Sequence, residues 1–201
     1  GTKMQQFPLP PGLAVDRGRV LDGLAQRVAM FAPARVLGDP DAELYGHVHL
    51  AKARAAWDHA RRRMVFEQEE LDWDTYRRYG LLDEDLAYGG SLDTLSLGER
   101  AFEIALARRV AEGAEETAWF DRHGSTPITE LPAEWPADYR AVVERRLALI
   151  ETNPHIRLLE RPEYKRRWAT RSWEDQERDA LQNFALDRLE DPELWRDPQG
   201  A

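Results

Sequence analysis

The amino-acid sequence predicts a mainly α-helical fold, a helical bundle with one long coiled-coil-like helix and Pro-rich loops. Apolar residues recur every three, four or seven positions through most of the 201 residues, which is typical of amphipathic helices. No segment keeps the alternation of apolar and polar residues that a half-buried strand requires. The 12 prolines fall between the periodic segments, where they indicate loops because proline cannot donate a backbone hydrogen bond.

Composition excludes several classes of protein. The chain carries 28 Lys+Arg against 37 Asp+Glu, for a formal net charge of -9, and no apolar run approaches the roughly 18 to 20 residues that cross a bilayer. Cysteine is absent, which excludes a disulfide framework and a thiolate metal site. Since no signal peptide or membrane span is apparent, we expect a cytoplasmic protein with no membrane partner.

Residues 1–15 are predicted to form an extended connector, because Pro8, Pro10 and Pro11 restrict the backbone. The chain begins at Gly1 without an initiator Met, and we therefore expect a fragment of a longer protein. A helical region is predicted over residues 16–122. Its first helix should be limited by Pro33 and has an apolar face formed by Leu21, Leu24, Val28 and Phe31.

The strongest pattern in this region predicts a long helix over about residues 41–78. Apolar side chains recur there every seven residues, at Leu50, Trp57, Met64 and Leu71. Such a repeat is typical of a helix that packs against a neighbouring helix as in a coiled coil. We call these four residues the interaction seam. The sequence leaves open whether this seam pairs within one chain or between chains.

Capping residues and prolines predict the remaining elements. Ser96 and Glu99 have the spacing of a capping box, so a helix is expected from Ser96 to about Gly113. Residues 123–136 are predicted to be a Pro-rich loop.

Residues 137–191 are predicted to hold the C-terminal helices. One should end at Asn153, because the residue before a proline disfavours the α conformation. A short helix is expected over residues 162–168, and Ser172 is expected to cap the last helix. Residues 192–201 are predicted to be a flexible tail.

Basic residues concentrate in the last third of the chain although the chain as a whole is acidic. Residues 140–171 hold nine bases against four acids, whereas residues 65–139 hold six bases against eighteen acids. The candidates for contacts with a DNA backbone are Arg161, Lys165, Arg166, Arg167 and Arg171. They alternate with Tyr164, Trp168 and Trp173, a mixture that suits phosphate contacts beside aromatic rings. The alternative is that the tryptophans anchor a core and the bases pair with nearby acids.

The sequence predicts no catalytic, cofactor-binding or metal-binding residue in this chain. The acids Glu67, Glu69, Glu70, Asp72 and Asp74 form a dense run. We interpret that run as a solvated helix face, because no lysine or histidine stands beside it with the spacing of a nuclease. The sequence also lacks a nucleophile elbow and a Gly-rich phosphate loop.

Several segments resemble one family, the PglX-like adenine-specific DNA methyltransferases of phage-growth-limitation (type 2 BREX) defence, which are related to type IIG-like enzymes. The segments are 1–3 (GTK), 7–10 (FPLP), 69–74 (EELDWD), 76–81 (YRRYGL), 145–151 (RRLALIE) and 156–168 (IRLLERPEYKRRW). The resemblance implies that the chain is the C-terminal helical region that follows the target-recognition region of such an enzyme.

The resemblance also implies a function for the longer enzyme, which would use S-adenosylmethionine to methylate adenine in double-stranded host DNA and so mark it as self. The family's Asn-Pro-Pro-Tyr motif is missing here, since the sole Asn-Pro pair, at Asn153, continues with His155. We therefore expect a non-catalytic segment that acts as a spacer or docking scaffold and contacts the DNA backbone. Its expected partners are the upstream methyltransferase and recognition domains, DNA, and other defence proteins.

Two alternatives come from other classes of function. The chain could be an independent helical adaptor that binds a partner helix along the interaction seam. Less favoured is a carboxylate-dependent nuclease that uses the acidic run.

Overall fold

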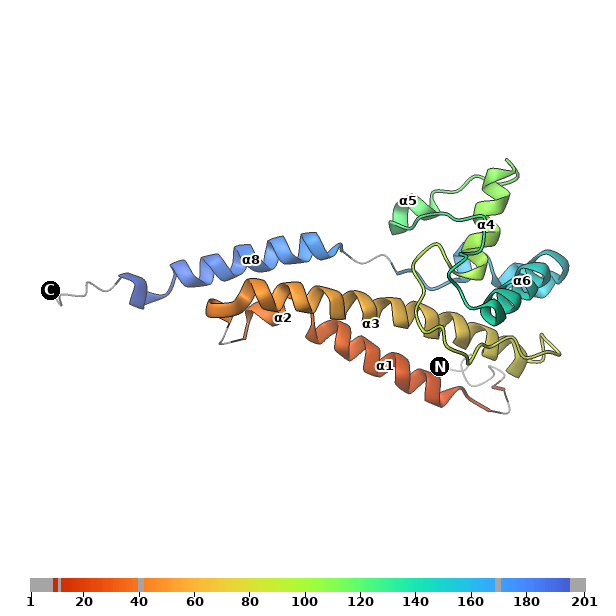
Figure 1. Ribbon diagram of the computed structural model, residues 1–201, viewed down its shortest axis with the longest axis horizontal. Coiled ribbons are helices and arrows are strands. Elements are labelled where there is room, and N and C mark those ends of the chain that lie inside the picture. The colour runs from red at the N-terminus through yellow and green to blue at the C-terminus, as the bar shows by residue number, and fades with distance from the viewer. Residues whose placement is uncertain (1–8, 11, 40–41, 169–170, 196–201) are drawn as a thin grey trace, which may run out of the picture. The chain divides into compact units, whose positions relative to one another are not determined.

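The computed structural model describes residues 9–10, 12–39, 42–168 and 171–195, and the described part is helical with no strand (Figure 1). The helices are α1 (Val15–Met30), α2 (Pro33–Leu37), α3 (Ala42–Arg78), α4 (Ala101–Ala111), α5 (Trp119–His123), α6 (Ala137–Thr152), α7 (Pro154–Leu159) and α8 (Trp173–Leu189). Two single 3-10 turns, η2 (Pro162–Tyr164) and η3 (Pro192–Trp195), complete the described elements. The predicted mainly helical class is confirmed.

The chain folds into two compact units. Unit 1 comprises Gly1–Gly23 and Arg62–Ala169, and unit 2 comprises Leu24–Arg61 and Thr170–Ala201. Helix α3 contributes its N-terminal part to unit 2 and its C-terminal part to unit 1. It is one continuous helix of 37 residues, which at about 1.5 Å per residue extends for roughly 55 Å.

Unit 2 has an apolar core in which α2 and α8 pack together. The buried members of this core are Leu37, Leu50, Ala53, Trp57, Trp173 and Ala180. The rings of Trp57 and Trp173 meet edge to face with centroids 5.6 Å apart, a favoured geometry for aromatic pairs. Ser172 caps α8 as predicted, because its hydroxyl accepts the N–H of Asp175 at 3.1 Å.

Unit 1 is built on the C-terminal part of α3 together with α4, α6 and α7, and α6 packs against both α4 and α7. A cluster of buried apolar residues lies around α4 and α5 and consists of Phe102, Leu106, Ala107, Trp119 and Phe120. The apolar face of α6 is also buried, at Tyr139, Val143, Leu147 and Ile150. These contacts place the start of α7 and the 3-10 turn η2 beside the charged groups described below.

Several local predictions are wrong for identifiable reasons. Helix α4 begins at Ala101 rather than Ser96. The Ser96 N–H does donate to Glu99 at 2.6 Å, but this bond closes a turn before the helix. Glu103 carries out the capping instead by accepting the N–H of Arg100 at 3.4 Å.

Proline positions account for other differences. Pro33 is the first residue of α2, rather than only a limit on α1. Asn153 ends α6 as predicted, but its side chain also caps α7, a helix not expected from the sequence, by accepting the N–H groups of His155 and Ile156. The helix expected over residues 162–168 is only the 3-10 turn η2.

The two ends of the chain fall partly outside the described residues. Of the expected connector, residues 1–8 and 11 lie outside them, and the described remainder leads into α1 at Val15. Of the expected tail, residues 192–195 form η3, and 196–201 lie outside. None of the helices formed by the described residues has the length and apolar character that a membrane span needs.

Candidate functional site

The basic residues singled out from the sequence divide between the two units. Arg161, Lys165, Arg166 and Arg167 belong to unit 1, and Arg171 belongs to unit 2. Arg161, Arg166 and Arg167 are exposed. Among the described residues, the guanidinium groups of Arg161 and Arg167 have no hydrogen-bond or ion-pair partner, whereas that of Arg166 lies 4.7 Å from the ring centroid of Trp168. The exposed arginines of unit 1 therefore present positive charge that the described residues do not neutralise.

Lys165 departs from the expectation of a surface phosphate contact, because its side chain is only 2% exposed. Its ammonium group forms an ion pair with Glu160 and donates to Asp72 at 2.9 Å and to the hydroxyl of Tyr76 at 3.1 Å. Burial alone lowers the pKa of Lys165, but the charges of Glu160 and Asp72 raise it well above its ordinary value. This lysine is a charged anchor between the basic segment and α3, and its donors are already used.

Glu160 is the second part of this anchor. Its Oε1 accepts a hydrogen bond from the Tyr76 hydroxyl at 2.6 Å, while its Oε2 is buried without a hydrogen-bond partner. Burial raises the pKa of Glu160 to about 7, although Lys165 and the Tyr76 hydrogen bond act in the opposite direction. The carboxyl is therefore protonated far more readily than an ordinary glutamate.

Two further contacts fix the segment that carries the exposed arginines. Arg100 donates to the carbonyl of Arg166 at 3.1 Å, and the side chain of Trp168 is buried. The backbone from Glu160 to Trp168 is thus held at its first residue, at Lys165, at Arg166 and at its last residue. The backbone that carries the exposed arginines is held in place before any ligand binds. Binding therefore loses less conformational entropy.

Arg171 has a different environment. Its guanidinium pairs with Asp179 at 2.7 Å and donates to the carbonyl of Asp175 at 3.3 Å. Lys165 and Arg171 thus fit the alternative in which bases pair with acids, whereas Arg161, Arg166 and Arg167 do not.

The acidic run on α3 was interpreted from the sequence as a solvated face, and this is wrong. Glu69 and Glu70 are 1% and 0% exposed, respectively. Arg146 of α6, also fully buried, donates to Glu70 at 2.6 Å and lies 3.6 Å from Glu69. Burial alone lowers the pKa of Arg146, but Glu70 and Glu69 raise it overall. The run is a neutralised interior group because an uncompensated buried carboxylate would be very costly.

The same interior group continues into α4. Arg100 forms a bidentate ion pair with Glu103, in which each of the two nitrogen–oxygen distances is 2.9 Å. The indole of Trp119 donates to Glu103 at 3.0 Å. Nine charged side chains of the described part of unit 1 are buried. Two of them, Glu67 and Asp74, pair with partly exposed arginines, and we call the other seven the buried charge network. Its members are Glu69, Glu70, Arg100, Glu103, Arg146, Glu160 and Lys165.

The other acids of the run also face bases. Glu67 pairs with Arg17 at 2.8 Å and with Arg63 at 2.6 Å, and Asp74 pairs with Arg78 at 2.8 Å. Within the described part of the chain, no group of three or more His, Asp and Glu side chains is arranged to hold a metal ion. This arrangement gives the nuclease alternative no support.

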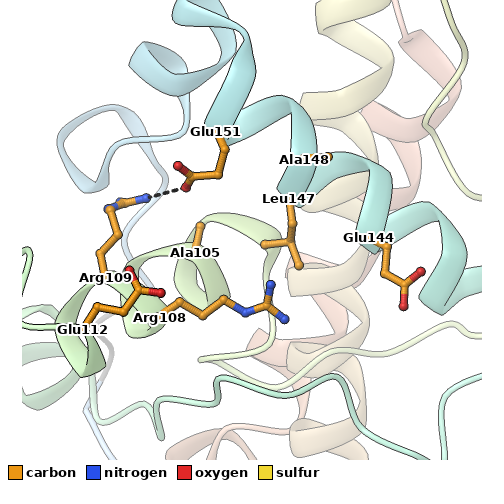
Figure 2. A pocket seen from close by; sticks show the side chains of 8 residues that line it. All are labelled: Ala105, Arg108, Arg109, Glu112, Glu144, Leu147, Ala148 and Glu151. Atoms are coloured by element: carbon orange, nitrogen blue, oxygen red, sulfur yellow. Dashed lines mark ion pairs between the residues drawn. The ribbon is translucent and has the colours of Figure 1, made fainter.

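A groove lies between α4 and α6 on unit 1 (Figure 2). Figure 2 shows Arg108 and Arg109 of α4 opposite Glu144 and Glu151 of α6, with Arg109 and Glu151 joined by an ion pair of 3.6 Å. Arg109 also pairs with Glu115 at 2.7 Å. Because bases and acids line it together, the groove does not select an ion of either sign.

The residues of the interaction seam lie largely inside the chain. Leu50 and Trp57 belong to the apolar core of unit 2, Met64 is buried in unit 1, and Leu71 is half-buried. Trp57 and Met64 are buried, while pairing of the seam with another helix in coiled-coil fashion stays a prediction. Leu50 and Trp57 are not available to a partner helix in this conformation, which counts against the adaptor alternative.

The buried charge network was not predicted from the sequence, although two signals for it exist. Arg146 lies within the apolar face of α6, between Val143 and Leu147 in the helical repeat. Glu69 and Trp73 are four residues apart on α3, and the indole of Trp73 donates to Glu69 at 3.1 Å. A base at a core position of α6 needs a buried acid as its partner. Glu69, beside Trp73 on α3, is such an acid, and the two signals together indicate a buried ion pair.

The chain is similar to one part of a much longer bacterial enzyme. Over its whole length it is 49% identical to a C-terminal part of the adenine-specific methyltransferase PglX of Streptomyces coelicolor. The matched segment is 17% of the length of PglX. No solved structure matches the chain. A family described as a domain of unknown function, DUF7008, matches residues 64–201, and the chain therefore belongs to the DUF7008 family.

Proposed function

We propose that the chain is a non-catalytic C-terminal helical segment of an adenine-specific DNA methyltransferase. In this proposal the longer enzyme uses S-adenosylmethionine to mark host DNA in the cytoplasm during anti-phage defence. The segment acts as a spacer or docking scaffold for the methyltransferase and recognition domains and for other defence proteins. It also contacts the DNA backbone through Arg161, Arg166 and Arg167.

The observation that carries the proposal is the identity of 49% to PglX across the whole chain. The match extends over the whole chain and therefore spans residues of both units. A match over the whole chain to one part of a methyltransferase supports a role within such an enzyme.

The non-catalytic assignment is supported by the role of Asn153, which belongs to the sole Asn-Pro pair of the sequence. Its side chain caps α7 by accepting the N–H groups of His155 and Ile156. The proposal therefore assigns the binding of S-adenosylmethionine to another part of the longer enzyme.

Contact with the DNA backbone is supported by the geometry of the basic segment. Three exposed guanidinium groups extend from a backbone that Lys165 and Trp168 hold in place, and guanidinium groups bind phosphate oxygens with matched geometry. Since the chain carries a net charge of -9, the contact is local and adds to others made elsewhere in the enzyme.

The salt dependence of DNA binding tests this contact in the longer methyltransferase. Replacing Arg166 and Arg167 together by Gln should weaken binding about equally for DNA of any sequence. The slope of log affinity against log salt concentration should fall by about one unit for each phosphate that the variant no longer binds, because each bound phosphate releases a counterion. The methylated adenine should stay the same.

A matched control removes the same charge elsewhere. Arg178 and Arg188 of α8 pair with Asp175 at 2.6 Å and Asp191 at 3.5 Å, and replacing both by Gln should leave the slope unchanged. An equal loss of slope in this control would mean that only net charge matters. An unchanged slope in the Arg166 and Arg167 variant would refute the backbone contact.

A further inference from the structure

Tyr164 has the most exposed aromatic side chain in the described part of unit 1. It is 63% exposed, whereas the neighbouring aromatic residue of the same segment, Trp168, is 6% exposed. No hydrogen bond of the Tyr164 hydroxyl to another described residue is formed. Exposing a tyrosine ring to water without a partner forgoes favourable burial, so this position calls for an explanation.

The ring is exposed because the backbone beneath it is fixed. Tyr164 is the last residue of the 3-10 turn η2, and its N–H donates to the carbonyl of Arg161 at 3.0 Å. The next residue is Lys165, whose side chain is drawn into the interior by Asp72 and Glu160. The turn and the buried lysine together orient Tyr164 toward solvent.

Three exposed arginines lie close to Tyr164 along the chain. Residues three apart in a 3-10 turn lie on the same side, which places Arg161 beside Tyr164. Arg166 and Arg167 follow directly after Lys165, and both are exposed. The groove that Arg161 lines is mixed in charge, with Arg109 and Arg157 beside the acids Glu115, Glu151 and Glu163.

An exposed aromatic ring flanked by exposed guanidinium groups matches the chemistry of an unpaired nucleotide. Every base has a flat face that stacks on an aromatic ring, and the phosphates on either side of the base pair with arginine. A paired base in a duplex offers no free face to such a ring, so stacking distinguishes an unpaired strand from a duplex.

We propose that Tyr164 stacks on an unpaired base of DNA while Arg161, Arg166 and Arg167 bind the phosphates that flank it. This inference rests on the proposed DNA contact and adds the kind of strand that is bound. Tyr164 contributes preference for an unpaired strand, and the arginines contribute affinity that depends on salt. The two contributions are therefore separable by experiment.

The test measures binding of the longer methyltransferase, with this chain unmodified or altered, to a labelled single-stranded oligonucleotide and to the duplex of the same sequence by fluorescence anisotropy. Replacing Tyr164 by Ala should weaken single-strand binding by about 5- to 100-fold, the effect of losing one stacked base. Duplex binding should change less than about twofold, and the salt slope should be the same as for the unmodified chain, because stacking releases no counterion. Tyr164→Trp should restore single-strand binding, because a larger ring keeps the stacking surface.

The control is Leu158→Ala, which removes an exposed apolar side chain (47% exposed) from α7 of the same unit. This variant should bind both oligonucleotides as the unmodified chain does, and circular dichroism should show all variants folded. If Tyr164→Ala binds the single strand as tightly as the unmodified chain, the stacking proposal is wrong while the arginine contact stands. Equal losses on both oligonucleotides would also overturn stacking, and binding to neither oligonucleotide by the unmodified enzyme would overturn both proposals.

Discussion

The two units use different chemistry for their interiors, although α3 contributes to both. Among the described side chains, those of α3 that are buried in unit 2 are Leu50, Ala53, Trp57 and Ala60, all without charge. In unit 1 the same helix buries Glu69 and Glu70 beside Trp73. The first interior gains free energy from removal of apolar surface from water. The second must first offset the loss of hydration of its charges.

The two interiors differ in how strictly they fix the positions of neighbouring side chains. An apolar core tolerates shifts of neighbouring side chains at modest cost, whereas a buried carboxylate requires its partner at hydrogen-bond distance. The buried charge network contains four carboxyls and three bases. Burial is the main cause of the raised pKa of Glu160, and the neighbouring charge of Glu69 adds to it.

The apolar core of unit 2 should show the largest loss of stability on a single substitution. Trp57→Ala removes a ring that packs edge to face on Trp173 and should lower the free energy of unfolding by about 3 to 5 kcal/mol. Urea denaturation measures this. The matched control is Trp195→Ala, because Trp195 is 72% exposed and should cost less than about 0.5 kcal/mol. A loss below about 1 kcal/mol for Trp57→Ala would contradict its place in the core.

The charged core of unit 1 should lose stability for a different reason. Arg146→Met keeps much of the apolar volume but leaves Glu70 without its cationic partner, so unfolding free energy should fall by about 3 kcal/mol. Adding Glu70→Gln should recover part of that loss, because a neutral amide still accepts the N–H of Tyr88. No recovery in the double variant would mean that the loss comes from packing alone.

The adjacent residue provides the control. Arg145 is half exposed and pairs with Glu84 at 2.9 Å on the surface, where an ion pair contributes little. Arg145→Met should therefore change the unfolding free energy by less than about 1 kcal/mol. A similar loss for both arginines would show that burial of the charge is not what matters.

Most of the fold could be predicted from the sequence because helix periodicity and proline positions are local signals. Helix α3 spans residues 42–78, where the heptad repeat predicts a helix over about 41–78. The short helices were harder, since α5 has five residues and α7 has six, too few for a period to be read. Their stability comes from caps and tertiary packing rather than from an apolar stripe.

The candidate site was only partly predictable from sequence. The basic segment was found because its charges are adjacent in sequence, and three of its arginines are exposed without ion pairs to described residues. Lys165 could not be separated from them, because its partners Asp72 and Tyr76 are about ninety residues away. The sequence gives the charge of each residue. Whether that charge is exposed to water or paired with a carboxylate depends on the fold.

The buried carboxyl of Glu160 should make the stability of unit 1 depend on pH. The pKa of Glu160 rises from 4.5, its ordinary value, to about 7 in the folded chain, so folding favours the protonated carboxyl. Its stabilising contribution is fully present below pH 4.5 and is lost as the pH rises through about 7. The groups that face this carboxyl are Lys165, Tyr76, Asp72 and Glu69. Lys165 stays charged across that range, because its own pKa is raised.

We therefore expect the unfolding free energy to decrease by on the order of 2 kcal/mol between about pH 4.5 and pH 7. Glu160→Gln should remove this part of the pH dependence, because an amide has no proton to lose and still accepts the hydrogen bond of Tyr76. Asp72→Asn is the matched comparison. It removes a second partner of Lys165 that is 25% exposed, and the decrease due to Glu160 should remain. Urea denaturation at a series of pH values measures all three proteins, and a decrease of equal size in Glu160→Gln would show that another carboxyl holds the extra proton.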